Sequence, residues 1–272
     1  MKSEPLPVIK DRFPFRLGTT SFILFDDYLP NVRHLAPMVD DIELLFTDPS
    51  DGALPDLAAM QEIRRIADRS SLSFTIHLPY DRDLGASDDA ARMEAVWDLV
   101  HVIERSRTLN PFAWILHPFC EWQHFGSDGP PGDWMDRFSA SIDFLLEKGI
   151  PPGRLCLENL RPAFNPLESL VATKGLSVCL DVGHIVIYGH DLDDFLKRYG
   201  SRIRVLHLHG IRDGRDHCSL AWLDPQVLET LMAFLHNGRA QRIVTLEVLG
   251  QADLDESLRV MSLYIPGGTS CP

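Results

Sequence analysis

The chain has 272 residues, of which 45% are hydrophobic and 24% charged, as in an ordinary globular protein. That length allows two small domains or one α/β barrel, which needs about 250 residues. The net charge of −13 weighs against nucleic acid as a partner, because non-specific DNA binding depends on Lys and Arg contacts. No run approaches the roughly 20 apolar residues of a membrane span. We therefore expect a small-molecule substrate and no membrane.

The cysteines indicate the redox compartment. Five are present, with no CxxC pair, and Cys156 and Cys179 lie inside apolar runs. This pattern is typical of reduced thiols, and the N-terminus lacks the apolar core and cleavage pattern of a signal peptide. A cytoplasmic location is the expectation.

Apolar, strand-like runs alternate with longer segments of helical spacing along the chain. Strands are expected at 15–24, 41–46, 73–78, 113–119, 154–160, 176–182, 204–210 and 242–248. Helices are expected between them, most clearly at 54–70, 88–109 and 191–200. Gly200 and Gly238 follow two helical runs, where a C-cap glycine is common.

Eight β units, each followed by an α unit, predict a parallel sheet that closes into a barrel with the helices outside. The fold class is α/β, a single (β/α)8 TIM barrel. One domain is expected over 1–272, with the barrel core at about 15–264 and tails at 1–14 and 265–272.

Chemistry in such barrels is located at the C-terminal ends of the strands. From the third strand onward, these ends carry His77, His117, Glu158, Asp181 with His184, His207 with His209, His217 in the following loop, and Glu247. Imidazole and carboxylate ligands suit Zn²⁺, Mn²⁺ or Fe²⁺. We predict a pocket with one to three divalent metal ions.

The alternative is that each of these residues is a separate buried polar group satisfied by the backbone. Uncompensated burial of three carboxylates is costly, which favours a shared site. The alternation of side chains between the two faces of a strand also supports a shared site. Glu158 shares a strand face with Cys156, and Glu247 shares one with Thr245. His207 and His209 share a face, so alternation does not separate them. We favour His207 as the ligand and His209 as a substrate contact or a support for the ligands.

The net charge of the site, ions included, distinguishes two reactions that it could support. One divalent ion beside Glu158, Asp181 and Glu247 leaves the site near −1, which suits a neutral sugar and proton transfer by carboxylates. Two or three ions leave it positive, which suits a phosphodiester. His77 and His117 can hold the extra ions and favour the multinuclear site.

Four further residues are candidates for substrate contact. Glu43 lies within the second strand, and its alternative role is a structural hydrogen bond. Tyr80 follows His77, where it lines the mouth of the pocket or simply belongs to a polar loop. Arg212 and Arg215 follow the seventh strand, where they either neutralise developing charge or are surface arginines.

The motifs IHLPY, LHPF, LENL, CLDVGH, LHLHG and TLEV resemble, in this order, the metal-bearing strand ends of the xylose-isomerase-like TIM barrels. This superfamily includes class II AP endonucleases and sugar epimerases, and the resemblance runs from about Phe15 to Val248. It implies that Glu158, Asp181, His207 and Glu247 form the common ligand set. His77, His117 and His184 match the extra ligands of the phosphodiester-cleaving branch. That branch has Asp-x-His after the seventh strand, where this chain has Arg215 before Asp216 and His217. A third metal ion then requires that Asp213 or Asp216 takes the place of the missing Asp.

The segments FRLGTTSFI, NVRHLAPMVDDIELLF and HLHGIRDGRDHCSL are similar to the cobamide-remodelling phosphodiesterases of this superfamily. That resemblance implies hydrolysis of the phosphodiester in the nucleotide loop of a cobamide. There are three alternatives. The first is a mononuclear Mn²⁺ ketose epimerase or sugar phosphate isomerase, in which Glu158 and Glu247 move a proton. The others are an AP endonuclease and a non-catalytic corrinoid or sugar-phosphate binding protein. The charge of −13 disfavours the endonuclease.

Overall fold

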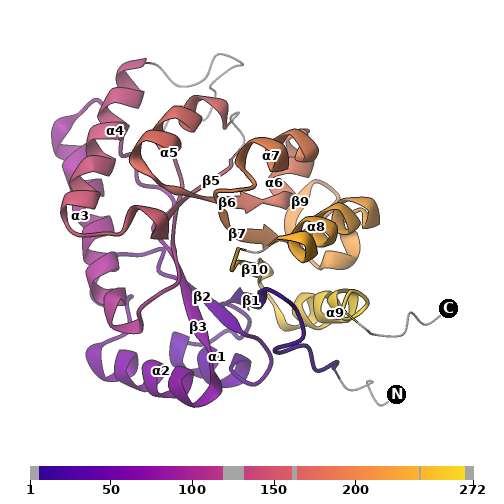
Figure 1. Ribbon diagram of the computed structural model, residues 1–272. Helices are drawn as coiled ribbons and strands as arrows, with labels where there is room; N and C mark the ends of the chain where they lie inside the picture. The colour runs from indigo at the N-terminus through magenta and orange to yellow at the C-terminus, as the bar shows by residue number, and fades with distance from the viewer. Residues whose placement is uncertain (1–5, 119–131, 161–163, 239, 267–272) are drawn as a thin grey trace.

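The structure, a computed structural model, describes residues 6–118, 132–160, 164–238 and 240–266. Within them, eight parallel strands close a barrel in the order β1-β10-β7-β6-β5-β4-β3-β2, and helices surround it (Figure 1). The barrel strands are β1 Arg16–Thr20, β2 Asp41–Leu45, β3 Ser73–His77, β4 Trp114–Leu116, β5 Leu155–Glu158, β6 Ser177–Asp181, β7 Ile203–Leu208 and β10 Ile243–Leu246. The predicted TIM barrel is confirmed.

The helices alternate with the barrel strands, and aspartates cap several of their N-termini. They are α1 Tyr28–Leu35, α2 Leu57–Ser70, α3 Asp89–Ser106, α4 Gly132–Glu147, α5 Glu168–Lys174, α6 Val182–Ile187, α7 Leu192–Tyr199, α8 Pro225–Asn237 and α9 Gln251–Ser262. Asp56, for example, accepts a hydrogen bond from the Ala59 backbone N–H at the start of α2. Asp88 and Asp191 cap α3 and α7 in the same way. None of the described helices is long and apolar enough to cross a membrane.

Two separate apolar clusters stabilise the barrel. The larger cluster fills the space between strands and helices. The smaller one consists of Ala113, Ile115, Cys156, Cys179, Val205 and Ile243, whose side chains point inward below the predicted site. Burial raises the pKa of Cys156 to about 12, so this thiol stays protonated and serves packing. The barrel is therefore closed by apolar side chains beneath a polar upper layer.

The structure corrects several predicted boundaries. β1 ends at Thr20 rather than at residue 24, and β4 covers three residues of the predicted 113–119, of which 119 lies outside the described part. Parts of both predicted tails, 1–5 and 267–272, also lie outside it. The elements themselves were predicted in the right order.

One element was missed. The segment after β7, treated as a loop, forms an antiparallel hairpin of β8 Gly210–Arg212 and β9 Arg215–Cys218. Asp213 and Gly214 at its turn have φ values of 53° and 74°. Two positive φ values are what a two-residue type I′ turn requires, and Asp-Gly is a preferred pair for it.

Candidate metal centre

The predicted ring of polar residues assembles at the C-terminal end of the barrel. Glu158 and Asp181 are the last residues of β5 and β6, and His77 is the last residue of β3. His207 lies within β7, while His117 and Glu247 follow β4 and β10. All but His117 are buried, so their side chains meet away from solvent.

The geometry around His207 is that of a metal-ligand set. Its Nδ1 atom lies 3.3 Å from Glu247 Oε2, 3.6 Å from Glu158 Oε2 and 4.0 Å from Asp181 Oδ2. Ligands bonded to one ion at about 2.1 Å in tetrahedral geometry would lie about 3.4 Å apart. The spacing of these donors therefore fits a single divalent ion between them.

Hydrogen bonding within the cluster supports the same interpretation. Glu158 Oε2, Glu247 Oε2 and His207 Nδ1 are buried, and none has a hydrogen-bond partner of acceptable geometry among the described residues. Buried polar atoms are rarely left unpaired in folded proteins. Three unpaired donor atoms that converge on one point are explained by an ion, and these residues fit a divalent metal.

A second group of donors shares Glu158. His117 Nε2 lies 3.2 Å and His77 Nε2 3.6 Å from the same Oε2 atom that faces His207. His77 Nδ1 donates to the Leu78 carbonyl at 2.8 Å, so its Nε2 lone pair points to the site. Glu158 thus stands between two donor clusters, as a carboxylate that bridges two ions would.

The structure places Glu43 in a hydrogen bond with His207, which was the alternative to a substrate contact. Glu43 is fully buried, and its Oε2 accepts a hydrogen bond from His207 Nε2 at 3.0 Å. This bond places the His207 proton on Nε2 and leaves Nδ1 free to bind a metal, as carboxylate–histidine–metal arrangements do. Glu43 therefore orients a ligand from below the cavity.

Asn159, which the sequence analysis did not single out, fixes the end of β6. Its side chain accepts from the Asp181 backbone N–H at 2.8 Å and donates to the Asp181 carbonyl at 2.9 Å. Its own carbonyl accepts from His184 Nδ1 at 3.0 Å, and the same nitrogen lies 3.6 Å from Glu158 Oε1 and 3.5 Å from Asp181 Oδ2. A polar residue directly after the Glu158 strand end was the available signal.

His209 supports Asp181 rather than lining the open cavity. It is fully buried, and its Nε2 lies 3.2 Å from Asp181 Oδ1. Its Nδ1 accepts a hydrogen bond from the His217 backbone N–H at 3.0 Å, so Nε2 carries the proton. Of the two roles proposed for His209, the structure favours support of a ligand.

The close approach of His209 makes Gly183 a sensitive position. A Cβ atom added to Gly183 would lie 1.9 Å from Cε1 of His209. Gly183→Ala is expected to lower the free energy of unfolding by about 3 kcal/mol and to weaken metal binding, because the ring that holds Asp181 must move. Urea unfolding and metal titration measure both effects. Gly153→Ala is the matched control, since nothing lies within 4 Å of the added Cβ there; equal behaviour of the two variants would contradict the expectation.

The β8–β9 hairpin brings His217 to the site. His217 Nε2 lies 3.5 Å from Glu247 Oε2, and its Nδ1 lies 3.0 Å from Asp216 Oδ1. Asp216 thus stands beside His217, whereas Asp213 is exposed at the turn. Of the two candidates to replace the missing Asp, Asp216 is the one near the site.

Three predicted substrate contacts lie at the rim. Arg212 and Arg215 face each other near the hairpin turn and are exposed, with the Arg212 guanidinium 4.5 Å from the centre of the Trp222 ring. Tyr80 is half-exposed, with its ring centre 6.2 Å from that of His117. Tyr80 is thus placed beside His117, at the edge of the donor cluster.

Burial and neighbouring charges shift the pKa values of several residues of the donor cluster. Burial would raise the pKa of Glu158, but the charges of His117 and His207 hold that pKa well below its usual value. Burial lowers the pKa of His217, and Glu247 and Asp216 outweigh it and raise this pKa to about 10. Burial also lowers the pKa of His77, and Glu158 outweighs it and raises this pKa above its ordinary value. His217 is therefore protonated near neutral pH, and His77 holds its proton more tightly than a free imidazole does.

Metal binding should consequently depend on pH. A metal must displace the protons on His77 and His217, whose pKa values are raised, so the apparent metal affinity is expected to rise as the pH increases. The expected slope is about tenfold per pH unit for each displaced proton. Zn²⁺ competition against a chromophoric chelator at pH 6, 7 and 8 measures this slope, with the chelator calibrated alone. A flat affinity would contradict the proton displacement.

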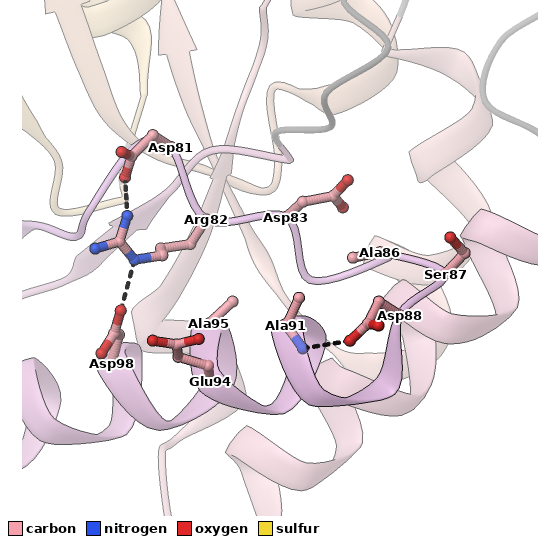
Figure 2. A pocket seen from close by; sticks show the side chains of 10 residues that line it. All are labelled: Asp81, Arg82, Asp83, Ala86, Ser87, Asp88, Ala91, Glu94, Ala95 and Asp98. Carbon is pink, nitrogen blue, oxygen red and sulfur yellow. Dashed lines mark hydrogen bonds and ion pairs between the residues drawn. The ribbon is translucent and has the colours of Figure 1, made fainter.

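A second cavity, of about 720 Å³, lies outside this cluster, between the chain after β3 and helix α3 (Figure 2). Asp81, Asp83, Asp88, Glu94 and Asp98 line it, with Arg82 paired to Asp98 at 2.6 Å and to Asp81 at 2.5 Å. None of the predicted metal ligands lines this cavity.

Solved structures with the same fold include both kinds of enzyme considered above. Endonuclease IV from Thermus thermophilus is 22% identical with a TM-score of 0.71, covering 93% of this chain and 100% of its own. A D-tagatose 3-epimerase-like protein is 17% identical with a TM-score of 0.70, over 92% of this chain and 97% of its own. The IolI protein with a bound zinc atom is 13% identical with a TM-score of 0.70, over 92% and 96%. At these identities the likeness shows the fold alone.

Comparison with curated proteins gives no match. A family model, in contrast, matches residues 39–263, which include the donor residues from Glu43 to Glu247. The chain belongs to the xylose isomerase-like TIM barrel family.

Proposed function

We propose that the protein is a metal-dependent hydrolase that cleaves the phosphodiester in the nucleotide loop of a cobamide. The observation that carries the hydrolase assignment is the shared position of Glu158 Oε2, which lies 3.2 Å from His117 Nε2 and 3.6 Å from His207 Nδ1. One carboxylate between two donor clusters favours two or more ions. A site with that charge suits an anionic phosphodiester better than a neutral sugar.

Divalent ions, when bound, would polarise the phosphoryl oxygens and lower the pKa of a water molecule. The chain's own residues prepare the site for them. Glu158 and Glu247 have pKa values well below the usual range, because nearby histidines outweigh the effect of burial, and so stay ionised. Asp181 is held by His209 and by the backbone N–H of His184, at 2.6 Å. These contacts fix the ligands before substrate arrives.

The choice of a cobamide rests on the resemblance of the segments around residues 15–23, 31–46 and 207–220 and on the charge of the chain. A net charge of −13 disfavours DNA as a substrate, whereas a single phosphodiester in a bulky ligand adds little repulsion.

A mononuclear ketose epimerase is the second candidate. Glu158 and Glu247 approach the same atom, His207 Nδ1, at 3.6 and 3.3 Å. Two carboxylates on one ion could move a proton between the faces of a bound ketose. One metal per chain, with activity indifferent to His77→Ala, would favour this reaction over hydrolysis.

Incubation of the metal-loaded protein with adenosylcobalamin tests the proposal. We expect a change from base-on to base-off absorption and products whose masses locate the cleaved bond. Metal content per chain is measured on the same sample, and two or more ions are expected. Unchanged adenosylcobalamin with Zn²⁺, Mn²⁺ and Fe²⁺ would refute the cobamide assignment, and D-fructose turnover with one ion would establish the epimerase.

A further inference from the structure

Exposed apolar side chains gather around the mouth of the barrel. Most of the exposed large hydrophobic residues among those described follow the C-terminal end of a barrel strand: Phe22, Phe25, Tyr80, Val186, Tyr188, Trp222 and Leu249. Isolated exposed apolar residues need no explanation, but a group at one face indicates an interaction site. This face is the one that holds the metal donors.

A cavity of about 630 Å³ concentrates this apolar surface at one side of the mouth. The segment after β1 and the segment after β10 form it, with Phe22, Phe25 and Leu249 as its exposed apolar residues. We call these three residues the apolar shelf. Asp26 and Asp27 also line the cavity and add carboxylate acceptors. Its volume is in the range of small-molecule sites.

The apolar shelf is continuous with the metal centre. Leu249 follows Glu247 by two residues, so their Cα atoms are at most about 7 Å apart. The Thr20 hydroxyl donates to the Val248 carbonyl at 2.7 Å and ties the two segments together just below the shelf. A ligand held by the donors at Glu247 would therefore extend over Phe22 and Leu249.

The shelf is held in place before any ligand binds. The buried Asn31 side chain accepts from the Leu24 N–H at 2.8 Å and donates to the carbonyls of Leu24, Asp26 and Asp27. The Phe22 ring lies 6.1 Å from Tyr28, whose edge contacts the buried Phe46 ring. Phe25 is thus fully exposed on an anchored segment. An ordered loop that exposes an aromatic ring beside a binding site favours affinity, because little entropy is lost on binding.

We propose that the apolar shelf binds the corrin ring of the substrate, with Asp26 and Asp27 accepting hydrogen bonds from amide N–H groups at the ring edge. This proposal rests on the proposed function, and it assigns one part of the substrate to one surface. A flat, largely apolar macrocycle with amide side chains matches an apolar floor with carboxylates at its border. A sugar phosphate would leave Phe25 and Leu249 uncovered.

Equilibrium dialysis with dicyanocobinamide, which has the corrin ring but no nucleotide, tests the shelf separately from catalysis. The metal-loaded wild type should bind it, and Phe25→Ser with Leu249→Ser should raise Kd at least about tenfold, because apolar contact area is lost. Leu263→Ser is the matched control, since Leu263 is 77% exposed directly after the end of α9, at the opposite end of the barrel. Its Kd should equal that of the wild type.

No binding of dicyanocobinamide by the wild type, or an unchanged Kd in the shelf variant, would overturn the proposal. Binding of 5,6-dimethylbenzimidazole in its place would assign the shelf to the nucleotide base. Cleavage of adenosylcobalamin is followed in parallel. Binding of dicyanocobinamide without cleavage of adenosylcobalamin would support the apolar shelf and refute the hydrolase. Cleavage with an unaltered Kd in the shelf variant would support the hydrolase and refute the shelf.

Discussion

Glu158→Gln is expected to lower phosphodiester hydrolysis by at least about a thousandfold and to reduce the bound metal below that of the wild type. The amide keeps the shape of the side chain and removes the charge. Oε2 of Glu158 faces nitrogen atoms of His77, His117 and His207, so both donor clusters lose their common ligand. Metal content after dialysis and the rate with adenosylcobalamin measure the effect.

The matched control is Glu62→Gln, which removes a carboxylate paired with Arg65 on the surface of α2. That variant should keep full activity and metal content. Far-UV circular dichroism of both variants shows whether the barrel is intact. A folded Glu158→Gln protein with wild-type metal content would remove Glu158 from the metal centre and undermine the hydrolase proposal.

Asp41→Asn is expected to stabilise the protein increasingly as the pH rises. Burial raises the pKa of Asp41 to about 7, despite the hydrogen bond from the Ser73 hydroxyl at 2.5 Å. A carboxyl whose folded pKa exceeds its unfolded value of 3.8 stabilises the fold at low pH. That contribution is lost between about pH 4 and pH 7, and amounts to about 4 kcal/mol. The neutral asparagine does not undergo this loss.

Urea unfolding of both proteins at pH 4.5, 6 and 8 measures the difference, in which the contributions of all other groups cancel. The Asn variant should gain on the wild type by about 3 kcal/mol across that range, because part of the change lies below pH 4.5. Gln61→Asn, a change between two neutral amides at an exposed position of α2, should give a pH-independent difference. The same constant difference for Asp41→Asn would show that the Asp41 carboxyl is ionised in the fold at no cost.

The barrel could be predicted because its elements follow simple periodicities. Strands buried on both faces, such as β6 and β10, are nearly continuous apolar runs, and aspartates such as Asp56 and Asp191 cap helices outside the barrel. Boundaries were less accurate. β1 ends at Thr20 although the apolar run continues to Leu24, because the segment turns and bonds to Asn31.

The convergence of the polar strand ends could be predicted because the strand ends of a parallel barrel meet at one level. Glu158 and Asp181 could be placed in the site from the positions of their strands alone. The partner of His207 could not be predicted in this way, since Glu43 lies across the barrel and 164 residues away in sequence. Its contact depends on barrel curvature and side-chain rotamers, which alternation does not describe. The same reasoning applies to the bonds from Asn159 to Asp181.

The position of His217 has a consequence for how this metal centre can diversify. His217 is carried by a hairpin outside the barrel wall, next to the turn at Asp213 and Gly214. Side chains alternate along such a strand, so a one-residue insertion at the turn would present Asp216 or Cys218 to the ions in place of an imidazole. Hard oxygen or soft sulfur donors would then select different metals, while the eight-stranded wall stays intact. Length variation in one surface ribbon can thus change metal preference without any change in the barrel core.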